Sequence, residues 1–172
     1  RTSRMSIRAT VAAVVAVVLA ALTGCTPAPT DQAAAPGVET VEVIAVVDGD
    51  TIDIATDAGT ARVRLIGIDT PEIGRDGEQG ECYAEEARDF LDALVYGRAV
   101  EVRSDPSQAD ADRYGRLLRH VIIDGNSAAV LALEAGAGYE YTYDQAYDGQ
   151  DQHRAAEQAA ADAGAGLWAA CS

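Results

Sequence analysis

Hydrophobic and polar positions follow two different periods along this chain. A valine-rich run covers residues 38–47, and apolar positions then alternate with polar ones over residues 52–55 and again over residues 62–65. Residues 57–59 (DAG) supply the small and polar side chains that a tight hairpin turn needs. Alternation with period two and turn residues between the runs predict three consecutive strands.

Later segments add two strands and three helices to this prediction. Residues 99–103 and 117–123 predict two further strands, a helix capped by Ser127 is expected over residues 127–135, and an alanine-rich helix over residues 150–163. An earlier helix is predicted by apolar residues that share one helical face: Tyr83, Ala87, Phe90, Leu91 and Leu94. Five strands and about three helices define an α+β fold.

The N-terminal region predicts an export signal over residues 1–24. Arginines precede an apolar run at residues 11–22, which is too short for a comfortable membrane span. The sequence LTGC at residues 22–25 resembles a bacterial lipobox, so Cys25 is the expected lipidation site and the protein is expected at the outer face of the cell membrane. An ordinary secretory signal, which would release the protein, is the alternative.

Residues 25–37 have the proline and alanine content of a linker, so a single folded domain is expected over residues 38–172. Two cysteines remain in that domain, Cys82 and Cys171. In an exported protein they predict one disulfide, with two free thiols as the alternative.

The charge is strongly acidic. Asp and Glu number 28, Lys and Arg together 13, and the formal net charge is −15. Attraction to phosphates normally drives nucleic-acid binding, so composition alone argues against a nucleic-acid partner unless the basic groups gather at one site.

The predicted hairpin brings charged residues together. Its two open ends would place Asp50 near Asp69, with Glu72 on the following loop and Arg64 on the second strand. Carboxylates and carbonyl oxygens suit calcium, a further carboxylate can act as a general base, and a guanidinium can hold a phosphate. The alternative is a plain polar turn beside a solvated arginine.

Three motifs decide between these interpretations. The sequences DGDT at residues 48–51, DTPE at residues 69–72 with Arg64 five residues earlier, and DRYGR at residues 112–116 resemble the active-site motifs of the thermonuclease family, the staphylococcal nuclease-like domains. The resemblance covers about residues 38–168. It implies a five-stranded Greek-key barrel of the OB type with packed helices.

The resemblance also implies a metal and a base. Asp50 and Asp69 would bind Ca²⁺ through their carboxylates and Thr70 through its backbone carbonyl, and Glu72 would orient or deprotonate the attacking water. Hydrolysis would break the 5′ P–O bond of DNA or RNA and leave 3′-phosphates, with single strands preferred. No protein partner is expected, and the protein should be a monomer.

Further residues are expected to contact the substrate. Arg64 and Arg116 would neutralise the charge that develops on the phosphoryl group. Expected substrate-binding side chains are Arg113, Tyr114, Tyr141 and Tyr143, while Tyr139 and Tyr147 are expected to pack or to lie on the surface. His120 and His153 stand on different elements without ligand spacing, so the sequence does not support a zinc site and assigns them structural roles.

Two other functions fit parts of the pattern. Barrels of the OB type also bind oligonucleotides, and related degenerate domains bind proteins, without cutting anything. A calcium-dependent surface adhesion domain would fit the acidity. Degenerate binding domains usually lose the carboxylates or arginines that this chain retains, and an adhesion domain does not explain Arg64 and Arg116 at their spacings. A calcium-dependent nuclease is therefore the favoured interpretation.

Overall fold

Five strands close into a barrel in the computed structural model, which describes residues 37–171. They are β1 (Val38–Asp48), β2 (Thr51–Thr56), β3 (Gly59–Leu65), β5 (Ala99–Arg103) and β6 (Leu117–Ile123). β1 pairs antiparallel with β2 and with β5, and β3 closes the ring by pairing in parallel with β6. The expected five-stranded barrel of the OB type is therefore confirmed.

The barrel interior follows from the alternation in the sequence. Successive side chains of a strand point to opposite faces, so every second residue points into the core, and these residues are the apolar ones. Two register shifts in β1, between Val43 and Ala45 and between Val46 and Asp48, let one long strand pair with two neighbours. The buried strand residues are Val41, Val43, Ile52, Ile54, Val63, Leu65, Val100, Val102, Val121 and Ile123.

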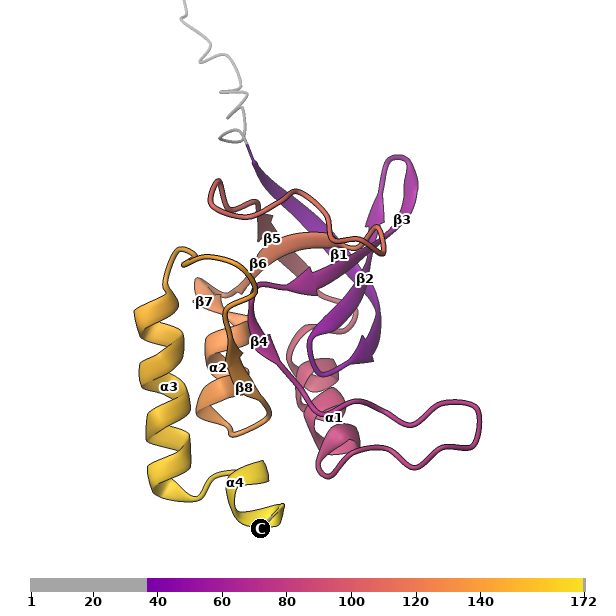
Figure 1. The fold of residues 1–172 in the computed structure, drawn as a ribbon. Helices are drawn as coiled ribbons and strands as arrows, with labels where there is room; N and C mark the ends of the chain where they lie inside the picture. The colour runs from indigo at the N-terminus through magenta and orange to yellow at the C-terminus, as the bar shows by residue number, and fades with distance from the viewer. Residues whose placement is uncertain (1–36, 172) are drawn as a thin grey trace, which may run out of the picture. The chain divides into compact units, whose positions relative to one another are not determined.

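Four helices accompany the barrel: α1 (Ala84–Val95), α2 (Ala128–Glu134), α3 (Gln150–Ala163) and α4 (Leu167–Ala170). Figure 1 shows α2, α3 and α4 grouped on one side, with α1 beneath the strands. Ser127 caps α2 as expected, because its hydroxyl accepts the N–H of Val130 at 3.3 Å. The short α4 was not anticipated as a helix; it buries Leu167 and sets Trp168 edge-on against Tyr139.

Three short strands were also missed by the sequence analysis: β4 (Gly67–Asp69), β7 (Asn126–Ser127) and β8 (Tyr139–Tyr141). β4 and β8 form a separate antiparallel pair in which Gly67 faces Tyr141. Strands of two or three residues are too short to display alternation, which explains the omission. The pairing places the tyrosine-rich strand directly beside the segment that carries Asp69.

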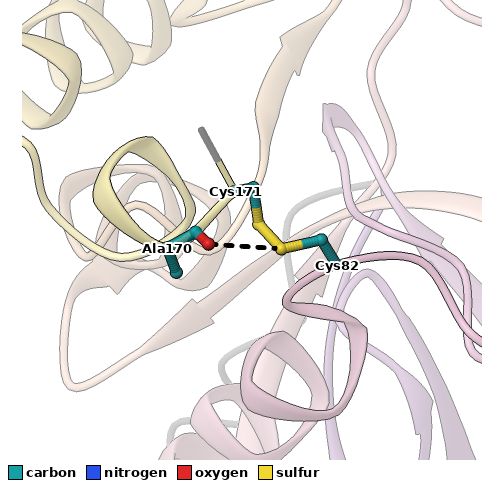
Figure 2. The surroundings of a disulfide bond; sticks show 3 residues. All are labelled: Cys82, Ala170 and Cys171. Carbon is teal, nitrogen blue, oxygen red and sulfur yellow. Dashed lines mark hydrogen bonds between the residues drawn. A yellow bond between two sulfur atoms is a disulfide. The ribbon is translucent and has the colours of Figure 1, made fainter.

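A disulfide joins Cys82, just before α1, to Cys171, just after α4 (Figure 2). It links segments that lie 89 residues apart in the sequence. The Cys82 sulfur also lies 3.7 Å from the carbonyl oxygen of Ala170. Since a disulfide sulfur carries no proton, this approach is a contact and not a hydrogen bond.

The export signal, the lipidation residue Cys25 and all of the linker but Gly37 lie outside the described residues, so the corresponding expectations stay predictions. Over residues 37–171 no helix is both long and apolar enough to cross a membrane.

Candidate active site

Asp50 lies in the turn between β1 and β2 and is only 4% exposed. Its carboxylate accepts the N–H of Thr70 at 3.1 Å, and its backbone carbonyl accepts the N–H of Leu65 at 2.9 Å. Gly49 permits this close approach, because a Cβ atom at that position would meet the side chains of Thr70 and Ala87 at 2.9 Å. The turn is therefore fixed against the end of β4.

Arg64 joins the carboxylates of this region. Its Nη1 donates to the backbone carbonyls of Leu65 and Ile68 at 2.9 and 2.6 Å, which fixes the plane of the guanidinium. Its Nη2 lies 3.0 Å from a carboxylate oxygen of Asp50 and 2.7 Å from one of Asp69. The side chain is nearly buried, so Arg64 is not a solvated strand residue.

Two carboxyl groups of this region have pKa values above their usual range. Burial raises the pKa of Asp50 to about 7; Arg64 opposes this rise and the neighbouring Asp48 adds to it. Burial also raises the pKa of Glu72, helped by the negative charges of Asp48 and Asp69. A carboxyl group whose pKa moves toward neutrality is better matched to proton transfer near pH 7.

The donor set can be compared with the needs of calcium. Among residues 37–171, no three His, Cys, Asp or Glu side chains gather closely enough to hold a metal by side chains alone. The expected set needs only two side chains, Asp50 and Asp69, with the carbonyl of Thr70. Because both carboxylates already share one cationic nitrogen of Arg64, their oxygens and their combined charge fit a hard cation.

Arg116 is held by a partner within its own motif. Asp112 accepts the Nε–H of Arg116 at 2.7 Å with one oxygen, and the N–H groups of Tyr114 and Arg116 at 2.9 Å each with the other. Burial raises the pKa of Asp112, but these hydrogen bonds outweigh it and the pKa lies below its usual value. The Tyr114 ring centroid lies 4.7 Å from the Arg113 guanidinium carbon and 5.6 Å from that of Arg116.

These groups line one cleft of about 540 Å³. Its lining comes from β3 and β4, from the loop before β6 and from the segment after β8. Asp50 and Thr70 are buried beside the cleft and do not line it. The lining includes eight of the residues expected from the sequence: Arg64, Asp69, Glu72, Arg113, Tyr114, Arg116, Tyr141 and Tyr143.

A buried aspartate connects the loop before β6 with the segment after β8. The sequence analysis did not identify this residue. Asp105 accepts two hydrogen bonds from Ser107, one from His120 Nε2 at 2.9 Å and one from the N–H of Asp148 at 2.8 Å. Gln145 donates in turn to the carbonyl of Ser107. An Asp-Pro-Ser sequence at the start of a loop signals an Asp-centred turn, but not the distant partners.

His153 and Tyr147 pack against each other, and each makes a hydrogen bond or close polar contact within the fold. His153 is buried, lies edge-on to Tyr147 with 5.2 Å between ring centroids, and places its Nδ1 3.0 Å from the carbonyl of Gly149. Tyr147 is buried as well and donates to Glu140 at 2.9 Å, while one side of its ring lines the cleft. Packing is therefore their role in this structure.

A barrel of the OB type with paired carboxylates and two arginines in one cleft defines a nuclease-like class of protein. Residues 62–170 match the family model described as Staphylococcal nuclease homologue, and the chain belongs to that family.

Curated relatives agree with this membership. The chain is 29% identical over 130 residues to "Thermonuclease" of Staphylococcus hyicus, covering 76% of each protein. It is 32% identical over 123 residues to "SPbeta prophage-derived endonuclease YokF" of Bacillus subtilis, covering 71% of this chain and 41% of the relative. It is 39% identical over 77 residues to "Micrococcal nuclease" of Shigella flexneri, covering 45% of this chain and 38% of the relative. The matched region thus spans under half the length of the Bacillus subtilis and Shigella flexneri relatives.

Proposed function

We propose that this protein is a calcium-dependent nuclease that hydrolyses DNA and RNA at the 5′ P–O bond and leaves 3′-phosphate products. The observation that carries the proposal is the cleft in which Glu72, Asp69, Arg64 and Arg116 meet. Two guanidinium groups from the neighbouring segments of β3 and the start of β6, with the carboxylates of Asp69 and Glu72 in the same cleft, suit a phosphodiester and an attacking water. Membership of a family whose relatives are named nucleases supports the same reaction.

In this mechanism Glu72 accepts a proton from the water that attacks phosphorus. Its raised pKa improves the match to proton transfer near neutral pH. Arg64 and Arg116 enter the reaction already oriented, by two backbone carbonyls and by Asp112 respectively, so little reorganisation is needed when charge develops on the phosphoryl oxygens. Calcium, bound by Asp50, Asp69 and Thr70, would polarise a phosphoryl oxygen.

Substrate preference follows from the aromatic side chains of the cleft. Tyr114 and Tyr143 are 68% and 73% exposed, and Tyr141 is 42% exposed. Exposed rings can stack on unpaired bases, so single strands are the preferred substrate in this proposal. Arg113 adds positive charge at the rim. With a net charge of −15, the protein depends on these few basic groups for binding.

The location of the protein is part of the proposal. We infer export, with lipidation at Cys25 holding a monomeric domain at the outer face of the cell membrane, or secretion if the lipobox is not used. The disulfide between Cys82 and Cys171 supports an oxidising compartment. In cells expressing the full chain, Cys25→Ser should move the protein from the membrane fraction to the medium.

The test is digestion of single-stranded DNA by residues 26–172, with calcium or with excess chelator. Wild type should cut only with calcium, and Glu72→Gln should lose at least a hundredfold in turnover while it unfolds at the same temperature. A folded wild-type protein that binds calcium but cuts nothing would favour a non-catalytic binding module.

A further inference from the structure

The loop that leaves the cleft after Glu72 returns to the backbone of Glu72 at Glu81. At this point the two residues exchange a pair of hydrogen bonds. The backbone N–H of Glu72 donates to the Glu81 carboxylate at 2.9 Å, and the backbone N–H of Glu81 donates to the carbonyl of Glu72 at 2.9 Å. The loop of residues 73–80 is thus closed at its base by one side-chain and one backbone interaction.

The base of the loop is also narrow. A Cβ atom on Gly74 would lie 2.1 Å from the carbonyl oxygen of Glu78 and 2.5 Å from the nitrogen of Gly80. Only glycine fits at Gly74 without displacing the backbone of the returning segment. The outgoing and returning chains therefore touch, and Glu81 can reach Glu72 without spanning a gap. Figure 1 shows the loop projecting from the domain between β4 and α1.

Glu81 is itself held firmly. Its carbonyl accepts the N–H of Ala84 at 3.2 Å, in the first turn of α1. The next residue, Cys82, is tied to Cys171 by the disulfide (Figure 2). The buried face of α1 then packs in the core through Leu91. Glu81 therefore connects the backbone of Glu72 to the rigid part of the domain.

Glu72 needs such a support. It stands on an exposed segment beyond the end of β4, and among residues 37–171 no side chain donates a hydrogen bond to its carboxylate. The hydrogen bonds that hold Glu72 among the described residues therefore run through its backbone N–H and carbonyl. Glu81 does not line the cleft and cannot touch a substrate there.

We propose that Glu81 is a positioning residue for Glu72: its carboxylate, anchored beside α1 and the disulfide, holds the Glu72 backbone so that the Glu72 carboxylate faces the attacking water. The inference rests on the proposed nuclease function. Loss of the hydrogen bond between the Glu72 N–H and the Glu81 carboxylate lets Glu72 leave its position, which lowers the rate of the chemical step. The arginines and tyrosines that bind the substrate stay in place.

The experiment compares Glu81→Ala, Glu81→Gln and Glu78→Ala with wild type and Glu72→Gln. Glu78 is a matched control because it lies exposed on the same loop and its side chain makes no contact with Glu72. With calcium and single-stranded DNA, Glu81→Ala should lower kcat about tenfold, the effect of losing about one hydrogen bond, with KM changed less than twofold. Glu81→Gln keeps an acceptor oxygen and should recover most of kcat, and Glu78→Ala should match wild type.

Amide hydrogen exchange, followed by NMR, provides a second readout that does not need activity. Exchange at the Glu72 N–H should accelerate several-fold in Glu81→Ala and stay unchanged in Glu78→Ala. The proposal is overturned if Glu81→Ala keeps the wild-type kcat, if Glu78→Ala loses as much, or if Glu72 exchange does not change. A wild type that cuts nothing overturns the proposed function and the positioning role with it, whereas a cutting wild type equalled by Glu81→Ala overturns the positioning role alone.

Discussion

Asp105→Asn should destabilise the fold by an amount that depends on pH. Burial raises the pKa of Asp105, but hydrogen bonds from His120, from the N–H of Asp148 and from Ser107 outweigh burial and bring the pKa to about 2, from an ordinary value of 3.8. The carboxylate is 2% exposed, so solvent screens these interactions little. Asparagine keeps the size of the side chain and removes the charge.

The pKa difference sets the magnitude. Each pKa unit corresponds to about 1.4 kcal/mol, so the ionised form contributes roughly 2 kcal/mol to the free energy of unfolding. Because the folded pKa is depressed, this contribution is fully present above the unfolded pKa and disappears as the pH falls through the folded pKa. It should be complete at pH 5 and above, about half as large at pH 3, and absent below about pH 2.

Urea unfolding of residues 26–172 at pH 7, 5 and 3 measures the difference between wild type and Asp105→Asn. Taking that difference cancels other carboxylates that titrate in both proteins. Asp57→Asn, in the exposed β2–β3 turn, is the matched control and should change stability by less than about 0.5 kcal/mol. A difference that is equally large at pH 3 and pH 7, or smaller than that of the control, would refute the assignment of stability to the ionised Asp105.

Three further predictions concern other contacts. Asp112→Asn should lower kcat about tenfold in the DNA digestion assay, because Arg116 loses a charge-assisted hydrogen bond; an unchanged kcat would show that Arg116 orients itself. Replacing Cys82 and Cys171 by serine should lower the free energy of unfolding by about 4 kcal/mol in urea, and an unchanged midpoint would contradict the chain-entropy account. Arg64→Lys should lower turnover at least a hundredfold and cost roughly 3 kcal/mol of stability, since an ammonium cannot reach two carbonyls and two carboxylates at once; retained activity would remove the need for a guanidinium.

Local sequence patterns predicted the part of the site that the hairpin of β2 and β3 forms. Alternation over β2 and β3 with a short turn between them forces the ends of the hairpin together, so the approach of Asp50 to Asp69 was visible without a structure. Arg64 was expected on the second strand of this hairpin, whereas Arg116 was identified only through the resemblance of its motif to the thermonuclease family. Eight of the ten site residues expected from the sequence line one cleft, and the other two, Asp50 and Thr70, are buried and do not line it.

Contacts between distant segments were not predictable in the same way. The pairing of β4 with β8, the hydrogen bonds that join Asp105 to His120 and Asp148, and the bond from Glu72 to Glu81 all depend on where loops return after the barrel has closed. Such loops have no periodicity, and a carboxylate in them looks the same whether it is solvated or buried.

The sequence by itself therefore determined the five barrel strands, the three longer helices and the identity of the charged groups, because period and turn chemistry act between near neighbours. Only the tertiary structure decided what each charge faces. Arg64 was expected on a strand beside a phosphate, and the structure shows that it lines the cleft and also lies nearly buried against Asp50 and Asp69. Closure of the barrel buries Arg64 and Asp50 together, while Asp69 contacts Arg64 with a half-exposed side chain. This grouping of opposite charges, which no single segment contains, fixes their pairing.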